Sequence, residues 1–139
     1  MDRACTCFRI RRLSRVVAQL YDDALRPVGL RDTHLSLLSV LHAKDPLQVA
    51  TLARRLGADT TSASRAIAVL QRWGWVREDA AFDARSRSIA ITGAGEAVLT
   101  AAKPFWQAAQ VRIARATGAA GKDMQDARLK AAFHAIIHR

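Results

Sequence analysis

Apolar residues recur along this chain every three to four positions in most segments and every second position in one segment. From about residue 6 to residue 25 they step by three and four, which predicts one long amphipathic helix that ends at Pro27 and Gly29. A second helix is expected to begin with Asp32 or Thr33 as its N-cap. Apolar residues lie on nearly every side of this second helix, which indicates that it is buried.

Two short helices with a glycine between them are expected next. Residues 49–57 have one apolar face and end at Gly57, and residues 60–74 have another and end at Gly74. Asp59 or Thr60 is expected to cap the second of these helices. Two short helices joined by a turn that contains glycine predict a helix-turn-helix.

After Gly74 the apolar period changes to two. Residues 75–80 and 88–92 are typical of strands, and the polar residues 81–87 between them are expected to form a loop. A hairpin that directly follows a helix-turn-helix is a wing.

The C-terminal third of the chain is expected to be helical again. Thr92, with Glu96 in the first turn, caps a helix that runs to about Ala116, followed by a break at 117–121 and a last helix over about 122–138. Long helices with apolar stripes at both ends of a 139-residue chain cannot all be buried in one compact monomer. A dimer built from both ends is therefore expected. The alternative is a single bundle that buries every stripe internally.

Charge indicates a polyanionic partner. The chain has 22 basic and 12 acidic residues, 18 of the basic ones are arginine, and the net charge is +10. Arginine binds phosphates and guanine edges with two hydrogen bonds, which favours DNA or RNA over a membrane surface. No apolar run approaches the roughly 18 residues of a membrane span, and no secretory signal is recognisable, so a soluble cytoplasmic protein is expected.

The sequence offers little for catalysis or metal binding. It contains no Ser/His/Asp or Cys/His arrangement, no glycine-rich phosphate loop and no cluster with metal-ligand spacing. Cys5 and Cys7 form a C-x-C pair without the second pair of ligands that a structural zinc site requires. A non-enzymatic protein without cofactor or metal is predicted.

Five segments in series resemble the MarR family of winged-helix transcription regulators. They are YDDALRPVGL (21–30), LARRL (52–56), DTTSASRAIAVLQRWGWV (59–76), DAR (83–85) and the IT-x-x-G of 91–95. The resemblance implies a mainly α fold with a small β-wing, in which the N- and C-terminal helices form a dimerisation region. It places that region at 1–31 and 104–139, and the winged helix-turn-helix DNA-binding domain at 32–103.

The candidate DNA contacts lie in the first turns of the helix from residue 60 and in the wing. Short hydroxyl side chains at the start of a recognition helix can bond phosphates or base edges, and Arg65 can bind a guanine or a phosphate. We treat capping as an explanation for Thr60 but not for the other three hydroxyl residues. By resemblance, Arg85 reaches into the minor groove and Asp83 holds the wing or Arg65. The full predicted set is Thr60, Thr61, Ser62, Ser64, Arg65, Asp83, Arg85 and Arg87. The alternative is that the hydroxyls only cap the helix and the arginines are only solvated.

Two signals compete for control of DNA binding. The family often binds small aromatic or phenolic anions between its dimerisation and DNA-binding parts, where Arg11, Arg15, His34 and Trp106 could supply a cation, a hydrogen bond and a stacking surface. Each of these residues could instead be solvated or simply packed in the core. The other signal is peroxide, because the place of Cys7 in the first helix is similar to that of the reactive cysteine in the hydroperoxide-sensing branch. The tyrosines that accompany that cysteine are replaced here by Arg11, Asp32 and Leu35.

The sequence therefore predicts a homodimeric regulator, a repressor, that binds a pseudo-palindromic double-stranded DNA operator and is released by a small aromatic or phenolic ligand. The first alternative is a thiol-based peroxide sensor that uses Cys7. The second is a winged-helix module that binds protein or RNA without operator specificity.

Overall fold

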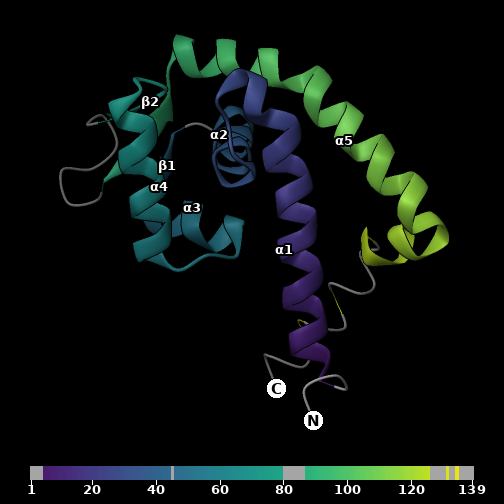
Figure 1. Ribbon diagram of the computed structural model, residues 1–139. Coiled ribbons are helices and arrows are strands. Elements are labelled where there is room, and N and C mark those ends of the chain that lie inside the picture. The colour runs from purple at the N-terminus through teal and green to yellow at the C-terminus, as the bar shows by residue number, and fades with distance from the viewer. Residues whose placement is uncertain (1–4, 45, 80–86, 126–130, 132–133, 135–139) are drawn as a thin grey trace.

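The computed structural model describes residues 5–44, 46–79, 87–125, 131 and 134. A lobe of short helices and strands lies beside two long helices, one of which arches over the other (Figure 1). The elements in chain order are α1 (Thr6–Leu25), a 3₁₀ turn (Arg26–Val28), α2 (Asp32–Lys44), β1 (Leu47–Gln48), α3 (Val49–Leu56), α4 (Thr60–Arg72), β2 (Val76–Asp79), β3 (Ser88–Ile91) and α5 (Gly93–Gln125). The predicted fold class, mainly α with a small β-wing, is confirmed.

Helix α1 covers the residues that its apolar period predicts, and it is joined to α2 by a carboxylate. Asp22 Oδ1 accepts a 2.7 Å hydrogen bond from the backbone N–H of Asp32, the first residue of α2. Its Oδ2 accepts from the Arg31 guanidinium at 3.3 Å. Burial, followed by the nearby Asp22 carboxylate, raises the pKa of Asp32. A side chain of α1 thus binds one of the unpaired N–H groups at the start of α2.

The core of the lobe is built around α2, whose predicted burial is confirmed. Leu37, Leu38 and Leu41 of α2 have no exposed surface. They belong to one apolar cluster with residues of the neighbouring elements, among them Leu25, Leu52, Ile67, Leu70 and Ile89. Leucines at consecutive positions face different sides of a helix, so α2 buries several of its sides at once.

The strands form one small antiparallel sheet in the order β1-β3-β2. The predicted hairpin is present as β2 and β3, with Val76 opposite Ile91 and Asp79 opposite Ser88. Strand β1 was not predicted, because two residues are too short to show a period. The wing residues 80–86 lie outside the described residues.

Helix α5 begins as predicted and is interrupted where the break was predicted. Thr92 Oγ1 accepts the Gly95 N–H at 3.1 Å, which confirms the expected cap. The expected end near Ala116 and the expected break at 117–121 are confirmed: Gly118 has non-helical backbone angles, φ 52° and ψ −132°, and a second helical segment continues from there to Gln125. Pro104 lies inside the helix, where it removes one backbone hydrogen bond, and α5 curves as it passes over α1 (Figure 1). Most of the last predicted helix lies outside the described residues. Within the described part, no helix is long and apolar enough to cross a membrane.

We expect Gly95→Ala to lower the free energy of unfolding by about 1–3 kcal/mol, as overpacking usually does. A Cβ at this position would lie 2.2 Å from the Trp75 carbonyl oxygen and 2.8 Å from Ile91 Cγ1. The carbonyl cannot easily move away, because it accepts the Thr92 N–H at 3.0 Å. Urea denaturation followed by circular dichroism measures the change.

Gly93→Ala is the matched control. A Cβ on Gly93 would meet nothing within 4 Å, and the residue belongs to the same first turn of α5. Equal unfolding midpoints for the two variants would show that the close approach at Gly95 does not limit stability.

Candidate DNA-binding surface

The first turn of α4 is closed by Asp59. Its Oδ1 accepts the Ser62 N–H at 2.8 Å and its Oδ2 accepts the Ser62 hydroxyl at 2.7 Å. These bonds, led by that from the Ser62 side chain, lower the pKa of Asp59, so this carboxyl stays ionised. The N-cap is therefore Asp59 and not Thr60. Our expectation that capping would account for Thr60 alone is wrong, because the hydroxyl used in capping is that of Ser62.

Helix α4 has one buried and one exposed side. Ala63, Ile67 and Leu70 face the core. The opposite side carries side chains at intervals of three and four residues, all exposed: Thr61, Arg65, Ala68 and Arg72. Thr60 and Ser62 are also exposed and Ser64 is half-buried. This arrangement gives a helix with short polar groups and one long cation at its free N-terminal end.

Arg65 is available for an external partner. Among the described residues it has no ion-pair or hydrogen-bond partner, unlike Arg31, which is held by Asp22. Arg54 and Arg55, in the last turn of α3, are exposed close to the turn that leads into α4. The predicted helix contacts thus lie together on one surface.

Arg87, one of the wing residues predicted to contact DNA, differs from Arg65 because it is already paired with a carboxylate. Arg87 Nη2 lies 2.6 Å from Glu78 Oε1, and its Nε donates to the same oxygen at 2.7 Å. This pair joins Glu78 of β2 to the residue before β3 and holds the Arg87 guanidinium beside the strand ends that adjoin residues 80–86. Asp83 and Arg85 lie outside the described residues. Contacts of all three with DNA stay predictions.

The four predicted ligand residues line three different cavities. Arg11 and Arg15 line one of about 470 Å³ on α1, Trp106 lines one of about 580 Å³ between α2 and α5, and His34 lines one of about 410 Å³ between α2 and α4. Within one protomer the structure does not bring these side chains into one site.

The groove between α2 and α5 contains residues that the sequence reading missed. His42 Nδ1 of α2 lies 2.7 Å from Glu96 Oε2 of α5, and Lys103 shares the groove with Trp106. The signal was present, because the α5 residues of this groove recur at intervals of one, three or four: Glu96, Leu99, Thr100, Lys103 and Trp106. A cation, an indole ring and an apolar wall suit a small aromatic anion.

His34 is buried at the start of α2, with 8% of its surface exposed. Its ring lies edge-on to Trp73, with centroids 5.1 Å apart. Burial, followed by the Arg31 charge, lowers the pKa of His34, against a smaller opposing effect of Asp22. Within the described part of the chain, His34 Nδ1 has no hydrogen-bond partner. His34 is thus an interior histidine, neutral near pH 7, and incompletely satisfied.

Cys5 and Cys7 are exposed thiols at the start of α1. They share their cavity with Arg11, Arg12 and Arg15. Oxidation of Cys7 stays a prediction. Across the described residues, no group of three or more His, Cys, Asp or Glu side chains could hold a metal ion.

Comparison with known proteins assigns this chain to a family. The sequence profile of the MarR family matches residues 28–86. The transcriptional regulator MosR of M. tuberculosis, solved in complex with DNA, is 36% identical, with a TM-score of 0.82 over 95% of this chain and 98% of its own. No curated protein sequence gives a significant match.

More distant structures share the fold. CouR from Rhodococcus jostii, bound to p-coumaroyl-CoA, is 21% identical, with a TM-score of 0.75 over 94% of this chain and 92% of its own. A mutant MarR from E. coli, complexed with operator DNA, is 18% identical, with a TM-score of 0.77 over 88% of this chain and 89% of its own.

The resemblance seen in the sequence is therefore confirmed by a profile match and by a relative aligned over nearly its whole length. Proteins of this family regulate transcription by binding DNA and are not enzymes. The chain belongs to the MarR family and is a winged-helix, DNA-binding transcriptional regulator.

Proposed function

We propose that this regulator is a homodimeric repressor that binds a pseudo-palindromic operator through α4 and is released by a small aromatic or phenolic ligand. The observation that carries the proposal is the exposed side of α4, where Thr61 and Arg65 face away from the core and Arg65 has no ion-pair partner among the described residues. A recognition helix enters the major groove with its N-terminal residues toward the bases. The 36% identity to MosR, which was solved with DNA, supports DNA as the partner of this chain.

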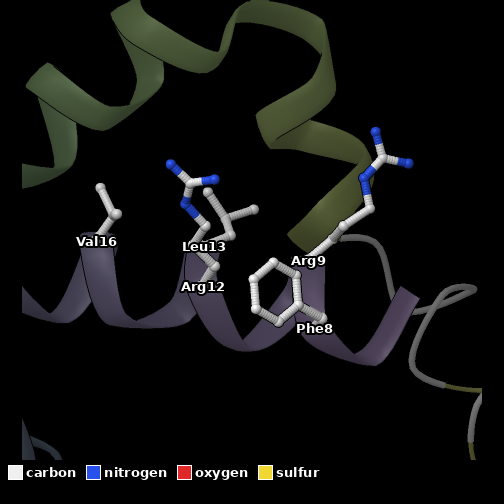
Figure 2. A pocket seen from close by; sticks show the side chains of 5 residues that line it. All are labelled: Phe8, Arg9, Arg12, Leu13 and Val16. Carbon is white, nitrogen blue, oxygen red and sulfur yellow. The ribbon is translucent and has the colours of Figure 1, made fainter. Parts of the chain in front are cut away.

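The exposed apolar residues of α1 support the homodimer. Phe8, Ile10, Leu13 and Val16 are between 39% and 54% exposed. Three of them, Phe8, Leu13 and Val16, line a cavity of about 550 Å³ together with Arg9 and Arg12. In Figure 2, Leu13, Val16 and the two arginines point from α1 toward α5, while the Phe8 ring lies in front of α1. Full burial of a large apolar side chain gains about 1.5–3 kcal/mol. These side chains are already about half-buried, so each would gain about half of that when a second copy covers the stripe.

A twofold dimer sets the form of the operator. Two copies of α4 related by a twofold axis fit half-sites about one helical turn of DNA apart, or about 10 base pairs. The predicted Arg85 contact would add minor-groove binding beside each half-site. Occupation of such a site near a promoter excludes the transcription machinery.

The groove between α2 and α5 suits the effector. Lys103 offers a cation and Trp106 a ring, while Leu35 and Leu99 supply apolar walls. This groove lies between α2, at the centre of the DNA-binding lobe, and the long helix α5. A ligand that fits better in one arrangement of these two helices shifts the population toward that arrangement. The p-coumaroyl-CoA complex of CouR shows that a protein of this fold can bind an aromatic thioester.

We expect Arg65→Ala to weaken operator binding by about 1–3 kcal/mol and to lower the slope of log K against log salt by about one if Arg65 binds a phosphate. Fluorescence anisotropy with a genomic operator fragment and a random duplex, over a salt series, measures both quantities. Arg112→Ala removes an exposed arginine from α5 and is the matched control. Wild-type protein that binds both duplexes equally would favour the alternative of a module without operator specificity.

We expect Leu13→Asp to shift the protein from dimer to monomer, because a carboxylate would have to be desolvated in the apolar stripe of α1. Sedimentation at micromolar concentration reads the mass, and operator titration should show a parallel loss of affinity. Ser14→Asp places the same charge at an exposed α1 position that faces away from Phe8, Leu13 and Val16, and should stay dimeric. If the Leu13→Asp variant stayed dimeric, the dimer interface would have to lie on another surface of the protein.

We expect Trp106→Ala to keep operator affinity but to lose release by hydroxybenzoates and hydroxycinnamates, since the ring that stacks on the ligand is removed. Calorimetric titration of the free protein and release of a labelled operator measure the two steps. Gln107→Ala, at the neighbouring exposed position, is the control. Ligand release that persists at wild-type concentrations in Trp106→Ala would place the effector outside this groove.

A further inference from the structure

Three rings stand in a row at the C-terminal end of α4, the end opposite the proposed DNA contacts. Trp73 lies edge-on to His34, with centroids 5.1 Å apart and planes at 86°, and close to Trp75 at 4.7 Å and 61°. His34 belongs to the first turn of α2, Trp73 ends α4, and Trp75 precedes β2. Ring pairs in this geometry are stabilised beyond the effect of area burial alone. We call His34, Trp73 and Trp75 the ring row.

The backbone fixes where the two tryptophans stand. Gly74 adopts a left-handed conformation with φ 74°. The Gly74 N–H donates to the Gln71 carbonyl at 3.0 Å, and the Trp75 N–H donates to the Leu70 carbonyl at 2.9 Å. These two bonds form a Schellman ending, so α4 stops at one defined residue and the chain turns directly into β2.

The start of α5 holds the same point from another direction. The Trp75 carbonyl accepts the Thr92 N–H at 3.0 Å, and the Thr92 hydroxyl donates to the Gly74 carbonyl at 2.6 Å. The end of α4 is thus bonded to α5 through backbone groups, whereas its link to the start of α2 runs through the rings of His34 and Trp73.

His34 takes part in this link through its ring rather than through hydrogen bonds. Its Nδ1 is buried and has no partner among the described residues. A buried polar atom without a partner lowers the stability of the fold. The edge contact between His34 and Trp73 helps to offset this loss. The lowered pKa of His34 keeps the ring uncharged near neutral pH.

We propose that His34 and Trp73 are positioning residues for DNA binding: the ring row fixes the tilt of α4 against α2 and thereby aims Thr61 and Arg65 at the operator. The helix has 13 residues and is about 20 Å long. A small rotation about its C-terminal end is therefore largest at its N-terminal end, where the contacts lie. The inference rests on the proposed role of α4 in the major groove, which Arg65→Ala tests separately.

The first test compares Trp73→Ala with Trp73→Phe, using operator and random duplexes at fixed salt. Trp73→Ala removes both ring pairs of the row and should bind the operator at least about three- to tenfold more weakly, the fold-change that loss of one such pair alone would give. It should bind random duplex as the wild type does, because misdirected side chains still meet phosphates. Trp73→Phe keeps an edge contact and should restore affinity to within about twofold. Equal losses on both duplexes, or no rescue by phenylalanine, would overturn the proposal.

The second test separates positioning from a direct contact of Trp73 with DNA. His34→Ala removes a buried ring that DNA cannot reach, and its effect on operator affinity should not add to that of Trp73→Ala in the double variant. Additive losses would assign Trp73 to the DNA interface itself. His34→Phe keeps a ring and has no unpaired nitrogen, so it should retain operator affinity even if His34→Ala does not fold. Binding of His34→Phe as weak as that of Trp73→Ala would exclude a role for the ring.

Discussion

The Trp75 carbonyl and the first turn of α5 approach so closely that only glycine fits at position 95. Thr92 satisfies both sides of this contact, since its hydroxyl caps the start of α5 and donates to the carbonyl of Gly74 at the end of α4. Few polar groups remain free there, and no side chain separates the two backbones. The end of α4 and the first turn of α5 are therefore joined almost rigidly. In the proposed dimer, a movement of α5 would therefore be passed on to α4 and would change the spacing of the two copies of α4.

Much of this fold follows from the sequence, because the apolar period of a helix stops where a helix-ending glycine stands. Helices α1, α3 and α4 carry an apolar face each, and glycines that adopt left-handed conformations end α3 and α4 at residues 57 and 74. The exceptions have physical causes. Strand β1 exists only because Leu47 finds Ile89 opposite it, which is a tertiary contact without a local pattern. The break at 117–121 is not such an exception, because Gly118 interrupts α5 as the sequence predicts and helical structure resumes beyond it.

The site was harder to predict than the fold. A sequence shows that several hydroxyls stand at the start of α4, but it does not show that Asp59 takes up the hydroxyl of Ser62. It likewise shows cations and rings without their partners in space, so Arg11, His34 and Trp106 were grouped although they line separate cavities. The helical period of α5 contained Lys103 and Glu96, but their importance depends on which face of α2 lies opposite.

Helix α2 connects the features on which regulation would depend. Its first N–H is bound by Asp22 of α1, its His34 contacts the end of α4, and its other side forms the groove with α5. Moving a two-state protein from 1% to 99% in one state requires a difference in ligand affinity of about 5.5 kcal/mol. The exposed His42–Glu96 pair could contribute only about 0–1 kcal/mol of this. Apolar burial contributes about 25 cal/mol per Å², so about 200 Å² of additional contact between ligand and groove in one state would suffice. A single aromatic ring closed between Trp106 and the leucines of the groove is of the right size, which is why the aromatic part of the effector, more than its charge, should decide whether the operator is released.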